Sequence, residues 1–205
     1  IDEYLFGLRH PYGRYLQFSD YDAIRQDLLS QHLHTLYSSA NCRLFLAGSF
    51  GETERKLINE VFGQQAWNAA DKAPEPGFTL APEPEKKHRI VNEESSVQGA
   101  IRIASTFPDK HHPDFSPMIV LNTLFGGYFG SRLMSNIRED KGYTYGIHSY
   151  QYNHRQCSAY LIATEAGKDV CEAAITEVYK EMELLRTELV DAEELQLVKN
   201  YLLGN

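Results

Sequence analysis

The sequence places a guanidinium and a phenol at a spacing that could bring both groups to one cleft. Arg138 falls near the C-terminal end of a short predicted helix, and Tyr145 begins a predicted strand just beyond Gly142. A tight turn between a helix end and a strand start can set two such side chains close together. Arginine offers a planar fork of donors to carbonyls or carboxylates, and a tyrosine O–H can donate to a developing oxyanion. Such a pair could hold a peptide backbone, but it could not cleave one alone.

Spacing by itself favours a structural role for these residues. Arg138 could pair with an adjacent carboxylate, and Tyr145 could pack in the sheet. The glycine turn at Gly126 and Gly127 likewise predicts the end of one helix and a turn, because glycine commonly follows a helix. A second interpretation of the turn is weak anion binding at the N-terminus of the helix that Ser131 begins.

The common hydrolase motifs are absent from the sequence. It contains no G-x-S-x-G, no H-E-x-x-H and no H-x-x-E-H. The eight histidines also lack metal-site spacing, since no two of them share one face of a predicted helix. The three cysteines have no motif spacing and favour free thiols over a disulfide framework. We therefore expect neither a complete catalytic site nor a metal site within this chain.

Composition and charge exclude further classes of protein. The 205 residues carry a formal net charge of −8, which argues against a nucleic-acid surface because phosphate binding needs clustered Lys and Arg. No stretch of apolar residues is long enough for a membrane span. Cytoplasmic and periplasmic locations are both compatible with the sequence.

Residues 1–63 predict a helix, a strand and a second helix. Ser19 with Asp22 predicts a capping box ahead of an apolar helical stripe over residues 21–37. Residues 41–48 read as a short buried strand, and residues 57–62 as a helix that Gly63 ends. Residues 64–88 then form a predicted linker, because proline interrupts both helix and central strand. The prolines of this linker are Pro74, Pro76, Pro82 and Pro84.

Residues 89–205 have a different order of elements. Strands and helices are grouped, which predicts an α+β fold with an antiparallel sheet covered by helices on one face. The predicted elements are strands at 89–92 and 99–107, helices at 115–125 and 131–142, a hairpin of 143–152 with 157–164, and helices at 171–185 and after Asp191.

Several short motifs occur in one order along nearly the whole chain. They are His10-Pro-Tyr-Gly-Arg14, the segment 21–48, Gly126-Gly127, Ser131-Arg132-Leu133, and Ile137-Arg138-Glu139 through Gly142 to Tyr145. In this order they resemble the pitrilysin/insulinase-type zinc metallopeptidases, the inverzincins. The first two resemble the region that follows the catalytic site of that family and the end of its first half. The others resemble the signature of its zinc-free second half.

The resemblance implies two similar α+β halves that face each other across a chamber, as in the pitrilysin/mitochondrial processing peptidase fold. The first half carries H-x-x-E-H and a distal Glu as zinc ligands. The second half lacks zinc and supplies an Arg and a Tyr, which hold the substrate and help to stabilise the tetrahedral intermediate. By position these are Arg138 and Tyr145, so the resemblance reverses the structural interpretation. It implies zinc in the parent enzyme and none in this segment, which should be inactive alone.

The resemblance also implies partners: a peptide substrate and a catalytic half, which lies upstream in the same chain or in a paired subunit. The sequence opens on Ile1 and closes inside a predicted helix, so we expect a segment of a longer protein. Residues 1–63 could dock where the closing elements of the second half belong; otherwise we expect a homodimer through an open sheet edge. The alternative functions are a non-catalytic scaffold subunit of the same family and a free-standing peptide-binding module.

Overall fold

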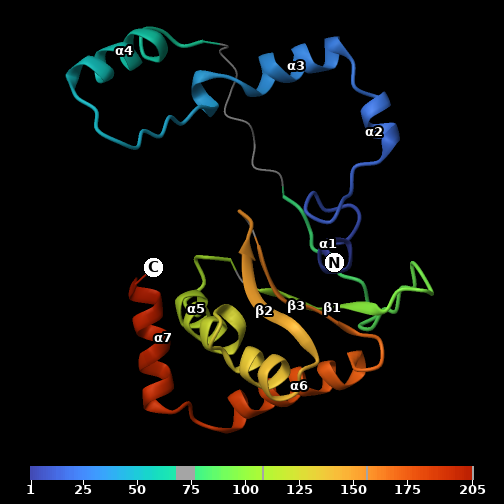
Figure 1. The fold of residues 1–205 in the computed structure, drawn as a ribbon. Coiled ribbons are helices and arrows are strands. Elements are labelled where there is room, and N and C mark those ends of the chain that lie inside the picture. The colour runs from blue at the N-terminus through green and yellow to red at the C-terminus, as the bar shows by residue number, and fades with distance from the viewer. Residues whose placement is uncertain (68–76, 108, 156, 205) are drawn as a thin grey trace. The chain divides into compact units, whose positions relative to one another are not determined.

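The computed structural model describes residues 1–67, 77–107, 109–155 and 157–204 (Figure 1). Contacts within the chain define two compact units. One consists of Ile1–Arg14 together with Leu80–Asn205, and the other is Tyr15–Thr79. The first unit contains the sheet and most of the buried side chains.

The sheet of the first unit has three antiparallel strands in the order β1-β3-β2. They are β1 (Gln98–Phe107), β2 (Thr144–Asn153) and β3 (Ser158–Gly167). The predicted strand at 99–107 and the predicted hairpin are therefore confirmed. The predicted strand at 89–92 is wrong, because β1 pairs with β3, whose two edges are taken by β1 and β2. β1 and β2 are the outer strands of the described sheet, and a homodimer through such an edge stays a prediction.

Helices cover one face of this sheet, and they enclose the main core (Figure 1). Ile147 and Ile162 of the sheet and Leu133 and Ile137 of the helical layer are almost wholly buried there. This arrangement confirms the predicted α+β fold with helices on one face. The helical elements are α5 (Phe115–Asn122), η2 (Thr123–Gly127), η3 (Met134–Asp140), α6 (Cys171–Thr187) and α7 (Ala192–Gly204).

The N-terminal segment lies on the opposite face of the sheet. Phe6 of α1 (Asp2–Phe6) is fully buried in a second cluster with Cys157 and Ala159. Ala159 and Ile162 of β3 point to opposite faces because their separation is odd, so α1 and the other helices sandwich the strand. Tyr12 extends this contact by stacking on His154 at 3.9 Å between ring centroids.

The second unit contains α2 (Phe18–Asp22), α3 (Gln26–Leu36), the short turn η1 (Ser39–Asn41) and α4 (Glu52–Phe62). The predicted capping box at Ser19 is wrong by two residues. The backbone N–H of Gln17 donates to the Asp20 carboxylate at 2.8 Å, so the helix starts at Phe18. The predicted helix over residues 21–37 is interrupted between α2 and α3.

The predicted strand over residues 41–48 is also wrong. Residues 42–47 have no helix or strand assigned, and Phe45 is 87% exposed. An apolar run becomes a strand only when a second strand supplies hydrogen-bond partners. The elements on either side of residues 42–47 are helical, so these residues have no neighbouring strand with which to form hydrogen bonds. The predicted helix over residues 57–62 is confirmed as the end of α4.

The structure describes only part of the predicted linker, residues 64–67 and 77–88. Pro74 and Pro76 lie outside the described residues. Pro82 and Pro84 lie in a described stretch, 77–97, that has no helix or strand. Part of this stretch follows α1: the N–H of Ala81 donates to the carbonyl of Phe6 at 3.2 Å.

Candidate functional site

Arg138 lies on η3, a π-helical segment rather than a regular α-helix. The N–H of Lys141 donates to the carbonyl of Asn136, five residues earlier, at 3.0 Å, and that of Tyr143 donates to Ile137 at 3.0 Å. Gly142 follows with a φ of +66°, a conformation that favours glycine. π-Helical turns are rare and occur often at functional sites. The predicted helix and its glycine stop are confirmed, with a wider last turn than expected.

Polar contacts fix η3 against α6 and α7. Arg132, just before η3, donates two hydrogen bonds to the Glu194 carboxylate of α7, at 2.8 Å and 2.7 Å. This pairing raises the pKa of Arg132. Asn136 donates to the carboxylate of Glu181 on α6 at 2.7 Å. With Ile137 in the core, these contacts hold η3 against α6 and α7.

Among the described residues, Phe129 and Glu139 lie beside the Arg138 guanidinium. Its central carbon lies 4.7 Å from the centre of the Phe129 ring, within cation–π range. One of its nitrogens is 3.6 Å from the Glu139 carboxylate. That separation is too long for a hydrogen bond, so the ion pair leaves the guanidinium donors available to a ligand. The predicted pairing with an adjacent carboxylate is thus present, but weak.

Tyr145 lies at an irregularity in β2. The register between β2 and β3 shifts between Thr144 and Ile147, which marks a β-bulge at Tyr145 and Gly146. The Tyr145 side chain is 94% exposed. It therefore does not pack in the sheet, which was one of the two interpretations that the sequence left open.

Arg138 and Tyr145 line one cavity of about 660 Å³. The turn at Gly142 connects the two residues, as the spacing predicts. Other side chains that line the cavity include Gln98, Glu139, Tyr143, Thr144 and Glu165. The lining thus offers hydrogen-bond donors and acceptors as well as apolar surface.

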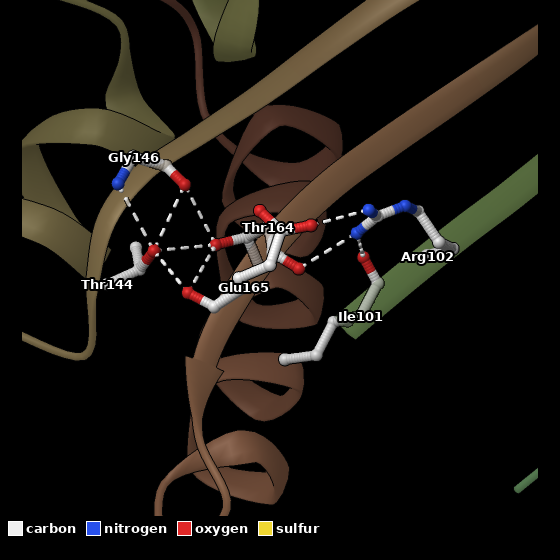
Figure 2. Close-up of polar contacts among 6 residues, drawn as sticks. All are labelled: Ile101, Arg102, Thr144, Gly146, Thr164 and Glu165. Carbon is white, nitrogen blue, oxygen red and sulfur yellow. Dashed lines mark hydrogen bonds and ion pairs between the residues drawn. The ribbon is translucent and has the colours of Figure 1, made fainter. Parts of the chain in front are cut away.

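Hydrogen bonds join the strands at the wall of this cavity (Figure 2). Arg102 of β1 pairs with the Glu165 carboxylate and also donates to the carbonyls of Ile101 and Thr164, at 2.8 Å and 2.9 Å. The Glu165 carboxylate is therefore already neutralised by Arg102. Arg138 is the cationic side chain among the described residues that line the cavity.

The two glycines of the predicted turn lie elsewhere. Gly126 and Gly127 end η2 and do not line the cavity. A Cβ on Gly126 would come within 2.5 Å of the Ser149 side chain and 2.8 Å of its backbone nitrogen. Glycine at 126 is thus required by the close approach of η2 to β2, in agreement with the structural interpretation of the turn.

The described ranges contain no group of three or more His, Cys, Asp or Glu side chains that could hold a metal ion. Within the same ranges, no helix has both the length and the apolar character needed to cross a bilayer.

Sequence reasoning missed the residues that shape the cavity around Arg138 and Tyr145. Thr144, Thr164, Glu165 and Arg102 come from three strands, and only the register of the sheet brings them together. Alternation along β2 gives no sign of the bulge, because the strand reads as regular on either side of it.

Comparison with known proteins identifies the family. Residues 23–202 match the model of the peptidase M16 inactive domain. The chain therefore belongs to the peptidase M16 inactive-domain family, which confirms the resemblance to the pitrilysin/insulinase-type zinc metallopeptidases.

Individual relatives agree with this assignment. The chain is 23% identical over 180 residues to the uncharacterized zinc protease YmxG of Bacillus subtilis (strain 168), a match that covers 87% of this chain and 42% of the relative. A peptidase M16 inactive domain from Pseudomonas fluorescens has a TM-score of 0.75 at 22% identity, covering 98% of this chain and 48% of that one. A chain of complex III2 from Candida albicans has a TM-score of 0.74 at 12% identity, covering 98% and 49%. The chain thus spans less than half the length of each of these relatives.

Proposed function

We propose that this chain is the non-catalytic, substrate-holding portion of a zinc metalloendopeptidase that hydrolyses peptides in a closed chamber. A catalytic half, in the same chain or in a paired subunit, supplies the metal site and the general base. Residues 1–63 close that first half, residues 64–88 link the halves, and residues 89–205 begin the second. Arg138 and Tyr145 hold the peptide and stabilise the tetrahedral intermediate.

The observation that supports this proposal is the shared cavity of Arg138 and Tyr145. A cavity of about 660 Å³ is large enough for a few residues of an extended peptide. The guanidinium of Arg138 has donors free to meet a peptide carbonyl. The exposed phenol of Tyr145 can donate to the oxygen that gains negative charge when the carbonyl becomes tetrahedral.

The two halves of the peptidase have different roles in this proposal, because one holds the metal site and the other supplies hydrogen-bond donors. The catalytic half would hold the zinc ion, which would activate the water needed for hydrolysis. The described residues of this chain supply no metal ligands as a group, but they supply two donors that line one cavity. Hydrogen-bond donors placed beside the reacting carbonyl stabilise the negative charge that develops on its oxygen. Gly126 and Gly127 have a structural part in this proposal: Gly126 lets η2 approach β2, and Gly127 ends η2.

The first test replaces each donor in the assembled peptidase, meaning this chain together with its catalytic half. Tyr145→Phe removes one hydrogen bond that forms in the transition state, so kcat should fall on the order of 10²-fold with KM nearly unchanged. Arg138→Ala removes a substrate contact as well, so both kcat and KM should change. Steady-state cleavage of a fluorogenic peptide measures both constants, and zinc content measured on the same samples should not change.

Matched controls come from α6, away from the cavity. Tyr179→Phe makes the same chemical change at an exposed tyrosine, and Arg186→Ala does so at an exposed arginine. Neither control should alter cleavage. Undiminished cleavage by both Arg138→Ala and Tyr145→Phe would mean that the proposed roles are wrong.

The alternatives make different predictions. A scaffold subunit would have no H-x-x-E-H in its partner half, and its assembly would not depend on Tyr145. A free-standing module would bind extended peptides without any catalytic half. Isothermal titration of this chain with an extended peptide tests the second alternative directly. The likeness to the complex III2 chain concerns the fold and does not favour a scaffold role.

A further inference from the structure

The bulge in β2 determines which face of the sheet Tyr145 lies on. Thr144 pairs with Ala166 of β3, and the next pair is Ile147 with Thr164. Three steps along β2 therefore match two steps along β3. In a regular strand Tyr145 would share a face with Ile147, which is fully buried in the core. The extra residue shifts the alternation of side chains between the two faces of the sheet. The Tyr145 side chain is therefore exposed rather than buried beside Ile147.

A bulge interrupts the ladder and leaves backbone groups without their usual partners. Around this bulge two threonine hydroxyls form hydrogen bonds with backbone groups of Gly146 and Glu165 (Figure 2). The Thr144 hydroxyl accepts from the N–H of Gly146 at 3.1 Å and donates to the carbonyl of Glu165 at 2.7 Å. The Thr164 hydroxyl lies 2.9 Å from the carbonyl oxygen of Gly146 and 2.8 Å from the Thr144 hydroxyl.

The two hydroxyls have one proton each, and this set of contacts uses both. Thr144 gives its proton to the Glu165 carbonyl, and Thr164 gives its proton to the Gly146 carbonyl. The N–H and C=O of Gly146 are then both satisfied, on either side of the Tyr145–Gly146 irregularity. Thr164 is 2% exposed, so water cannot easily replace its hydroxyl.

We propose that Thr144 and Thr164 are positioning residues: their paired hydroxyls hold the bulge that turns the Tyr145 phenol away from the core and into the cavity. The inference rests on the proposed function, because the bulge matters for catalysis only if Tyr145 contacts the substrate. It adds two residues to the substrate site that touch neither metal nor reacting atoms and act through Tyr145.

The first experiment tests the hydroxyl pair in this chain alone. Thr144→Val removes the acceptor of the Gly146 N–H, and Thr144→Ser keeps it. Amide exchange followed by NMR should show exchange at Gly146 about tenfold faster in Thr144→Val than in the wild type, and unchanged in Thr144→Ser. Thr106→Val, an exposed threonine of β1, is the control for losing a strand hydroxyl. Equal protection of Gly146 in Thr144→Val would overturn the inference.

The second experiment tests the action through Tyr145 in the assembled peptidase. Thr164→Val should lower kcat by roughly tenfold, and Thr164→Ser should restore it. In the Tyr145→Phe background the same Thr164→Val change should alter kcat less than about twofold, because the phenol it positions is already absent. Circular dichroism and zinc content of each variant establish that the fold and the metal site are retained.

The outcomes separate this inference from the proposed function. If Arg138→Ala and Tyr145→Phe both leave cleavage unchanged, the proposed function fails, whatever Thr164→Val does. If Tyr145→Phe slows cleavage and Thr164→Val does not, only the positioning role fails. An equal loss from Thr164→Val in both backgrounds would show a general structural role and would also overturn it.

Discussion

Arg138 and Tyr145 differ in how the protein holds them. The guanidinium of Arg138 has an aromatic ring and a carboxylate beside it, whereas the side chain of Tyr145 reaches into solvent. A ligand that fills the cavity would therefore bury Tyr145 mainly with its own atoms. Position in the strand, rather than packing around the ring, determines where the phenol lies.

Tyr160 of β3 differs from Tyr145 because its phenol is largely buried. This burial leads to a prediction about the pH dependence of stability. Burial raises its pKa to about 12, and a hydrogen bond with Ser149 opposes this rise only in part. The unfolded value is about 10. The folded state therefore keeps the proton between pH 10 and 12, while the unfolded state loses it. The contribution of Tyr160 to stability is fully present below about pH 10 and is lost as the pH rises toward 12.

The measurement compares the wild type with Tyr160→Phe by urea unfolding at several pH values. Between pH 10 and 12 the free energy of unfolding should fall more steeply in the wild type, by up to about 1.4 kcal/mol per pH unit. Tyr179→Phe, at an exposed tyrosine of α6, should leave the slope unchanged. Parallel curves for the wild type and Tyr160→Phe would contradict the prediction.

At the scale of elements, the π-helical segment η3 depends on its neighbours for its place. The Arg132–Glu194 pair joins its start to α7, and both side chains are less than one third exposed, 22% and 29%. Two parallel hydrogen bonds between a guanidinium and a carboxylate fix orientation as well as distance. The pair thus positions the helix that ends at Arg138.

We expect Glu194→Gln to destabilise the protein by about 1–2 kcal/mol, because the partly buried Arg132 loses its charged partner. The control is Glu183→Gln, which breaks the Arg186–Glu183 pair on the surface of α6, where the side chains are 77% and 57% exposed. That change should cost at most about 0.5 kcal/mol. Urea unfolding of both variants measures the difference, and equal costs would show that the Arg132 pair has no special role.

At the scale of the whole molecule, the two units differ in how much they bury. No residue of α3 or α4 in the second unit is buried, and apolar side chains such as Leu29 and Val61 are about 60% exposed. In the first unit β3 is buried along most of its length. Helices of 11 residues that bury nothing have little to stabilise them in water.

Hydrogen exchange measured by mass spectrometry should therefore distinguish the units. In this chain alone, peptides from α3 and α4 should exchange at least about a hundredfold faster than peptides from β3. Addition of the catalytic half should protect α3 and α4, because that half would cover their apolar side chains. Equal protection of both units in the isolated chain would contradict this prediction.

The sequence by itself determined the family and most of the elements. Periodicity located β1, the β2–β3 hairpin, α6 and α7, and the motif between Gly126 and Tyr145 identified the pair of candidate residues. Local pattern is sufficient there because an alternation of apolar and polar residues marks a half-buried strand, and an apolar stripe with a 3.6-residue period marks a helix.

Only the tertiary structure decided the rest. Residues 42–47 look like a strand but have none to pair with, and strand formation depends on a partner that local sequence does not supply. The face of the sheet on which the Tyr145 side chain lies depends on the register between β2 and β3. It therefore depends on Thr164, which lies in another strand. Register is a property of two segments together, so the residues that direct Tyr145 into the cavity become visible only once the sheet has formed.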